Sequence, residues 1–308
     1  MSVLVSLKPE TYRADGLDGF KVNPKFTLGN ALAMMWLSQL AYEADDHPET
    51  VDEVLPKFKL TKLKLGDRGP LERKASYIVA ARMDATFVMF AGTDPLKPQD
   101  LITDADLNPL WNDLHHGFLD AVSKVQRDVE AAITDNGAAG RPLFFTGHSM
   151  GGALAQISAQ LALESGLRAT AVYTFGGARA GGQDFFDSYD PDLGNCTFRL
   201  VYGKDIVAKV PPSFGGTFRH VGQFLHCVQG SAFTDGPLAP SSGNDPDLPL
   251  ASIPAVLGLL LSIPGIVEEL LESDLDARAF DKLKKLPDEI RDHVPASYFR
   301  ALKMPLLP

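Results

Sequence analysis

The fold of this chain is decided by the stretch Arg141-Pro-Leu-Phe-Phe-Thr-Gly-His-Ser-Met-Gly-Gly-Ala-Leu-Ala-Gln156. Residues 143–146 are apolar or β-branched and predict a short buried strand, whereas apolar residues at helical spacing from 153 onward predict a helix. Between them, residues 147–151 form the pattern G-x-S-x-G, with small residues where the chain turns sharply. Such a turn strains its central residue and lifts the Ser149 hydroxyl clear of the backbone, beside a helix N-terminus that favours negative charge. We therefore predict that Ser149 is a nucleophile, because this strand–turn–helix context disfavours a chance match.

Strands and helices alternate on both sides of this stretch. Beyond an amphipathic helix at 26–44, the expected elements are a hairpin at 76–83 and 86–90, a helix at 118–133, and strands at 170–175, 198–201 and 221–228. This alternation is typical of a largely parallel sheet covered by helices on both faces. Such sheets carry their chemistry at the carboxyl ends of the strands, where Thr93, Ser149 and Asp205 fall.

Length, composition and charge limit the classes of protein to which this chain can belong. The chain has 308 residues, 45% of them hydrophobic and 22% charged, as in an ordinary globular protein. That length fits one α/β domain as well as two, and we assign a single domain over 1–308. A net charge of −10 without a block of basic residues argues against a nucleic-acid partner. The two cysteines, Cys196 and Cys227, allow at most one internal disulfide and leave their pairing open. No secretory signal is visible in residues 1–10, and the cellular location stays unknown.

An apolar segment stands out near the C-terminal end. Residues 230–249 are rich in Pro, Gly, Ser and Asp and predict a surface excursion, which leads into twenty uncharged residues at 248–267. That length can span a bilayer, but three internal prolines argue against a transmembrane span. A buried helix and a flap over the site both stay open. We assign a lid or cap insertion to 230–275, with four candidate substrate-binding residues: Leu257, Leu260, Leu261 and Ile263.

A serine nucleophile needs a base to take its proton and an acid to orient that base. Asp205 follows a predicted strand and is the candidate acid, with turn capping as the alternative role. His220 and His226 flank a strand-like run, whereas His293 lies in a polar stretch that opens a final helix. Since a loop histidine can reach across strand ends, we assign His293 as the base and keep His220 as the alternative. His148 is expected to pack beneath the turn.

The oxyanion of an acyl-transfer intermediate needs two hydrogen-bond donors. The Met150 N–H at the start of the predicted helix is one candidate. Thr93 offers a second, because it supplies a backbone N–H and a hydroxyl together. Asp104 is placed to accept from the Thr93 hydroxyl, although a helix-end carboxylate is an equally good interpretation. Neither role requires a metal or an organic cofactor.

Taken together, the motifs resemble those of the class 3 (fungal-type) lipase family. In chain order they are Phe90-Ala-Gly-Thr-Asp94, Asp100-Leu-Ile-Thr-Asp-Ala105, His115-His-Gly-Phe118, Thr146-Gly-His-Ser-Met-Gly-Gly-Ala-Leu-Ala155, Tyr173-Thr-Phe-Gly-Gly-Ala-Arg-Ala-Gly181, Asp205-Ile-Val207 and Asp292-His293 with Tyr298-Phe299. The resemblance implies an α/β-hydrolase fold with Ser149, Asp205 and His293 as the triad. It also implies Thr93 and Met150 as the oxyanion hole, and a lid opened by lipid.

Three features depart from the family pattern. Ala91 stands where the family commonly has Arg, and Ala178 where it commonly has Pro. The gap between Asp205 and His293 is longer than usual and contains the apolar segment, so the lid need not be the loop after Thr93.

The expected function is hydrolysis of carboxylic esters by a lipase-type mechanism, through an acyl-enzyme on Ser149. The expected substrate is a lipid or small-molecule ester, met at a lipid–water interface. A phospholipase A1 or a feruloyl or aryl esterase would use the same residues with a different pocket. A lipase-like fold without catalysis is a third alternative, which an apparently complete triad disfavours.

Overall fold

The computed structural model describes residues 6–67, 74–92, 116–135, 140–211, 218–235 and 286–304. Several predicted residues lie outside these ranges: Thr93, Asp104 and the lid candidates Leu257, Leu260, Leu261 and Ile263. Most of the predicted insertion at 230–275 lies outside them as well.

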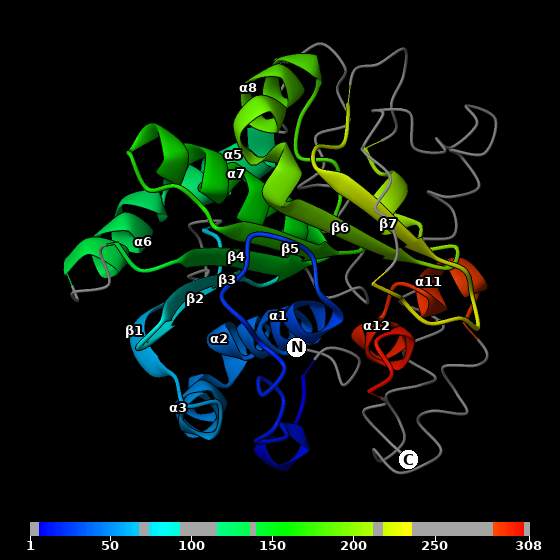
Figure 1. Cartoon of the computed structure of the whole chain (residues 1–308), viewed down its shortest axis with the longest axis horizontal. Coiled ribbons are helices and arrows are strands. Elements are labelled where there is room, and N and C mark those ends of the chain that lie inside the picture. The colour runs from blue at the N-terminus through cyan, green and yellow to red at the C-terminus, as the bar shows by residue number, and fades with distance from the viewer. Residues whose placement is uncertain are drawn as a thin grey trace.

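The described residues build one seven-stranded sheet whose strands follow one another in chain order (Figure 1). The strands are β1 (Thr61–Gly66), β2 (Tyr77–Arg82), β3 (Ala85–Phe90), β4 (Leu143–His148), β5 (Ala171–Phe175), β6 (Thr197–Tyr202) and β7 (Gln223–Cys227). β1, β2 and β3 pair antiparallel, and β3 through β7 pair parallel. The predicted mostly parallel sheet, including its leading hairpin, is therefore confirmed.

Helices cover both faces of the sheet, as expected. Parallel neighbours that follow one another in sequence are joined by right-handed crossovers, which place their helices on the same face. That face carries α5 (His116–Ser123), α6 (Gln126–Ile133), α7 (Met150–Glu164) and α8 (Gln183–Leu193) (Figure 1). The opposite face carries α1 (Leu28–Ala41), α2 (Glu43–Asp46), α3 (Pro48–Lys57) and α12 (Pro295–Ala301), while the short α11 (Asp288–Arg291) lies just before α12.

The central strands are buried on both faces, which explains their unbroken apolar runs. Successive side chains alternate between the two cores. Phe87 and Phe144 pack in the core on the α1 side, whereas Val88 and Phe145 pack in the core on the α7 side. The sheet is thus held from above and below, and the carboxyl ends of β4, β5 and β6 form a firm rim for a site.

The helix expected at 118–133 is two helices, so that prediction is wrong in detail. The helical ladder breaks between α5 and α6, where the Val125 N–H donates to the Val122 carbonyl oxygen at 2.9 Å in a tighter turn. The apolar spacing continues through the break, and Phe118, Val122, Val125 and Val129 are all buried. A periodic pattern therefore located the buried face correctly without revealing the bend.

The prediction against a transmembrane span concerns residues 248–267, which lie outside the described ranges, and the sequence leaves the pairing of the two cysteines open. No helix within the described ranges is long and apolar enough to cross a membrane. Cys196 and Cys227 are both free thiols, so they do not form a disulfide with each other.

Candidate active site

The turn around Ser149 is as sharp as its sequence predicts. β4 ends at His148, α7 begins at Met150, and Ser149 between them has φ 60° and ψ −134°, a strained conformation for a non-glycine residue. The flanking glycines make this turn sterically feasible. A Cβ atom on Gly147 would lie 2.1 Å from the Gly151 carbonyl oxygen, and one on Gly151 would lie 2.4 Å from the Phe90 carbonyl oxygen.

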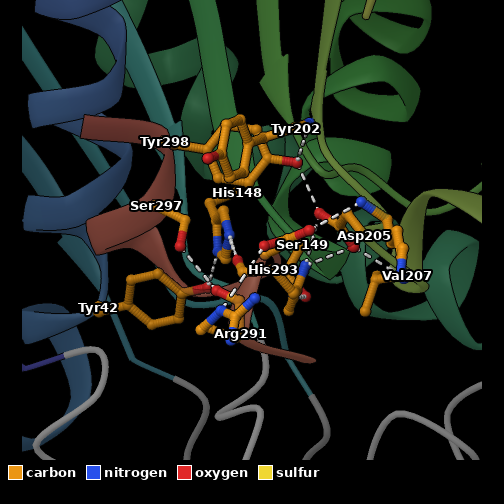
Figure 2. Close-up of polar contacts among 12 residues, drawn as sticks. Tyr42, His148, Ser149, Tyr202, Asp205, Val207, Arg291, His293, Ser297 and Tyr298 are labelled. Atoms are coloured by element: carbon orange, nitrogen blue, oxygen red, sulfur yellow. Dashed lines mark hydrogen bonds and ion pairs between the residues drawn. The ribbon is translucent and has the colours of Figure 1, made fainter. Parts of the chain in front are cut away.

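Ser149, His293 and Asp205 meet at the carboxyl-end rim of the sheet (Figure 2). The Ser149 Oγ lies 3.0 Å from His293 Nε2, and His293 Nδ1 lies 3.0 Å from both Oδ1 and Oδ2 of Asp205. All three residues are at least 98% buried. Because a carboxylate only accepts hydrogen bonds, the His293 ring carries its proton on Nδ1 and turns the Nε2 lone pair toward the serine.

Asp205 is held by two further donors. The Val207 N–H donates to Oδ1 at 2.9 Å, and the Tyr298 hydroxyl donates to Oδ2 at 2.5 Å. Burial and the neighbouring Asp205 raise the pKa of Tyr298 well above its usual value, so the phenol stays neutral and keeps its proton. The carboxylate therefore faces His293 in a single orientation.

The backbone around His293 is tied to the loop after β6 by the preceding residue. Asp292 is buried, and its Oδ2 accepts from the Lys204 N–H at 2.9 Å, while the Gln229 side-chain amide donates to the same carboxylate. Gly203 makes room for this contact, since a Cβ atom there would lie 2.1 Å from Asp292 Oδ2. The loops that carry the acid and the histidine are thus joined to each other directly.

Of the downstream histidines, only His293 is placed against Ser149 in the described part of the chain. The His220 Nε2 lies 2.7 Å from the Ala208 carbonyl oxygen, and His226 is exposed with its Nε2 3.0 Å from the Gly203 carbonyl oxygen. The structure differs from expectation in one respect: His293 is buried between α11 and α12 rather than lying in an open polar loop.

Of the two predicted oxyanion donors, only Met150 lies within the described residues. Met150 is the first residue of α7, directly after the serine. Thr93 lies outside the described residues. The preceding residue, Gly92, lies beside Ser149, because a Cβ atom on Gly92 would lie 3.0 Å from the Ser149 Cβ. Asp104, the expected support for Thr93, also lies outside.

Sequence reasoning missed the roles of Tyr298, Asp292 and Tyr42 in this site. Tyr298 lies five residues after His293, within the motif Asp292-His293 with Tyr298-Phe299. That spacing is the one sequence signal that indicates a role for Tyr298 in the site. His148 is buried beneath the turn, as expected, and contacts both His293 and Tyr42 (Figure 2). Both partners of His148 are more than 100 residues away in the chain, so no local sequence pattern indicated these contacts.

A serine at a strand-to-helix elbow, followed along the chain by an aspartate and a histidine that converge on it over a parallel sheet, defines the α/β-hydrolase fold. Solved lipases share this fold. The mono- and diacylglycerol lipase of Aspergillus oryzae superposes with a TM-score of 0.56 at 18% identity, over 74% of this chain and 94% of that chain. Lipase II of Rhizopus niveus superposes with a TM-score of 0.55 at 20% identity, over 75% and 92%.

Sequence comparison also finds lipases, over part of the chain. The model of the family described as lipase (class 3) matches residues 87–215. A secreted mono- and diacylglycerol lipase of Fusarium solani is 34% identical over 109 residues, which are 35% of this chain and 32% of that protein. A lipase of Caenorhabditis elegans is 30% identical over 135 residues, 43% and 33% respectively. Residues 87–215 thus resemble the class 3 lipase family, and the matches span about a third of the length of these curated relatives.

Proposed function

We propose that this protein hydrolyses carboxylic esters as a lipase-type serine hydrolase, with Ser149, His293 and Asp205 as its catalytic triad. The observation that carries the proposal is the unbroken path of hydrogen bonds from the Ser149 Oγ through the His293 ring to the Asp205 carboxylate. The burial of all three groups supports it further, because electrostatic interactions are stronger where water is excluded.

Acylation begins when His293 Nε2 takes the Ser149 proton and the serine Oγ bonds to the ester carbonyl carbon. The carbonyl oxygen becomes an oxyanion. We propose the backbone N–H of Met150 and the backbone N–H and hydroxyl of Thr93 as its donors. The tetrahedral intermediate then breaks its bond to the alcohol oxygen, which leaves with the proton that His293 returns. Asp205 stabilises the imidazolium throughout.

Deacylation repeats the sequence with water. His293 removes a proton from a water molecule, whose oxygen bonds to the acyl carbon. The Ser149 Oγ then leaves with the proton, and the carboxylic acid is released.

We propose lipid esters at a lipid–water interface as the substrate class, and mono- and diacylglycerols as the first candidates. The match of residues 87–215 to the lipase (class 3) family model supports the lipid ester. The partial glycerides come from the names of the Fusarium solani relative and of the Aspergillus oryzae structure.

Replacement of the nucleophile tests the proposal. Ser149→Ala removes only the Oγ, so we expect an unchanged circular dichroism spectrum and a loss of p-nitrophenyl ester turnover of at least about 10⁴-fold. A fluorophosphonate probe should label the wild-type protein and not the variant. Wild-type turnover in Ser149→Ala would remove the triad assignment.

A substrate panel tests the class. Emulsified mono-, di- and triacylglycerols, a phospholipid and a feruloyl ester are compared at equal protein concentration. We expect the acylglycerols to be cleaved fastest, with a rate that rises once the ester exceeds its solubility limit. A preference for phospholipid at the sn-1 position, or for the feruloyl ester, would reassign the substrate while keeping the site.

A further inference from the structure

His148, the residue before the nucleophile, contacts His293 in two ways. Its Nε2 lies 2.7 Å from the His293 carbonyl oxygen, and its ring stacks on the His293 ring with centroids 4.6 Å apart and planes inclined by 27° (Figure 2). The hydrogen bond holds the backbone of His293, and the stacked ring limits the tilt of its imidazole. Both contacts come from the last residue of β4, directly before Ser149.

The protonation of His148 follows from its partners. A carbonyl oxygen only accepts, so Nε2 carries the proton and Nδ1 is left as an acceptor in the neutral ring. The Tyr42 hydroxyl lies 2.7 Å from that Nδ1 and donates to it. Burial, together with the neighbouring His293, holds the pKa of His148 well below its usual value. The ring that stacks on His293 is therefore uncharged.

Tyr42 and the His148 backbone also lie beside Gly92. A Cβ atom on Gly92 would lie 2.4 Å from the Tyr42 hydroxyl oxygen and 2.6 Å from the His148 carbonyl oxygen. Gly92 is the residue before Thr93, the proposed oxyanion donor. The pair of Tyr42 and His148 thus packs against the histidine loop, the nucleophile turn and the strand end that leads to the oxyanion donor.

We propose that Tyr42 and His148 are positioning residues for the catalytic base. They hold His293 in register with Ser149 and pack against Gly92. Tyr42 locks His148 in the tautomer that donates to the His293 backbone. This inference rests on the proposed function, since it assigns His293 the role of base.

The neutrality of His148 is essential to this role. During proton transfer, His293 becomes an imidazolium, and a second positive ring 4.6 Å away would oppose that charge. A neutral imidazole provides the same flat surface without that repulsion. The competing explanation is a purely structural one, in which Tyr42 and His148 fill the core and satisfy each other.

Three variants separate the two explanations. Tyr42→Phe removes one oxygen atom and keeps the ring. His148→Phe keeps a flat ring and removes both hydrogen bonds, and His148→Gln loses the ring but restores an amide donor for the His293 carbonyl. Tyr189→Phe is the matched control, because it removes an equally buried hydroxyl, bonded to Thr197 Oγ1 at 2.8 Å, on the other side of the sheet.

We expect Tyr42→Phe to lower kcat by roughly tenfold and His148→Phe by roughly a hundredfold, with KM changed less than about twofold, because a misplaced base slows the chemical step more than binding. His148→Gln should recover part of the loss. The low-field proton resonance of His293 Nδ1–H should shift in Tyr42→Phe, and Tyr189→Phe should leave both readouts at wild type.

Wild-type kcat and an unshifted His293 resonance in Tyr42→Phe, with a loss of Tm equal to that of Tyr189→Phe, would overturn the positioning role. Failure of the proposed function has a different signature, namely no ester turnover and no fluorophosphonate labelling in the wild-type protein. In that case the His293 resonance still decides whether Tyr42 positions the ring.

Discussion

Gly176, at the end of β5, is the residue on which the packing around the acid and the histidine depends most directly. Its φ of +54° lies in the left-handed region, and a Cβ atom there would lie 2.2 Å from Asp205 Oδ2, 2.8 Å from the Tyr298 hydroxyl oxygen and 3.1 Å from His293 Nδ1. Any side chain would therefore displace the contacts that orient the carboxylate. Both conformation and space require glycine at this position.

The neighbouring glycine provides a matched comparison. A Cβ atom on Gly177 would meet only ordinary contacts, 3.4 Å from Thr174. We expect Gly176→Ala to lower the free energy of unfolding by about 2 kcal/mol or more and kcat by roughly a hundredfold. Gly177→Ala should stay within about 1 kcal/mol of wild type with its kcat retained. Urea unfolding and ester kinetics measure both effects, and equal behaviour of the two variants would contradict the account.

At the scale of elements, the site depends on how closely α7 approaches the sheet. The first turn of α7 passes over the ends of β3 and β4, with Gly151 against the Phe90 carbonyl oxygen and Gly152 against the Cα atom of Gly177. This close approach places the helix N-terminus at the serine, where the helix dipole favours negative charge such as that of the proposed oxyanion. The run of small residues thus serves both packing and chemistry.

This packing reverses an ordinary rule of helix stability. In an exposed helix interior, replacing glycine by alanine stabilises by up to about 1 kcal/mol. We expect Gly151→Ala to lower Tm instead, because the added methyl group would lie 2.4 Å from the Phe90 carbonyl oxygen. Glu164→Ala, at the exposed end of the same helix, should leave Tm nearly unchanged. A rise in Tm for Gly151→Ala would show that α7 does not pack this closely.

At the scale of the whole molecule, each of the two cores encloses a neutral histidine that bears on acid stability. His148 lies beneath the active site, and His220 lies beside the η4 turn (Val207–Lys209). Burial, followed by the charges of Arg199 and Arg179, holds the pKa of His220 well below its usual value. The folded protein therefore binds fewer protons than the unfolded chain below the usual histidine range.

The lowered pKa values of His148 and His220 decide how the free energy of unfolding changes with pH. The stability that these neutral histidines contribute is present above about pH 6.5 and is lost as the pH falls, by up to about 1.4 kcal/mol per pH unit for each residue. His220→Gln keeps a donor for the Ala208 carbonyl oxygen but cannot titrate. Urea unfolding at pH 7.5 and 5.5 should show a loss smaller by about 1 kcal/mol in the variant than in wild type. Parallel losses would contradict the assignment.

Local patterns in the sequence predicted a large part of this architecture. Strand-like runs, the G-x-S-x-G turn and the helical spacing after it were enough for the parallel sheet and its fold class, because these signals arise from neighbouring residues. The same patterns pointed to Ser149, Asp205 and His293, the three side chains that the structure brings together. His220 stayed open as an alternative base, since nothing local excludes a histidine beside a strand.

The tertiary structure alone decided which side chains complete the site. Tyr298 against Asp205, Asp292 against the loop after β6, and His148 between Tyr42 and His293 are contacts across 88 to 145 residues of chain. They depend on strand register, on the close approach of glycine backbones and on burial. No short sequence pattern encodes these quantities, because each exists only once distant segments have packed together.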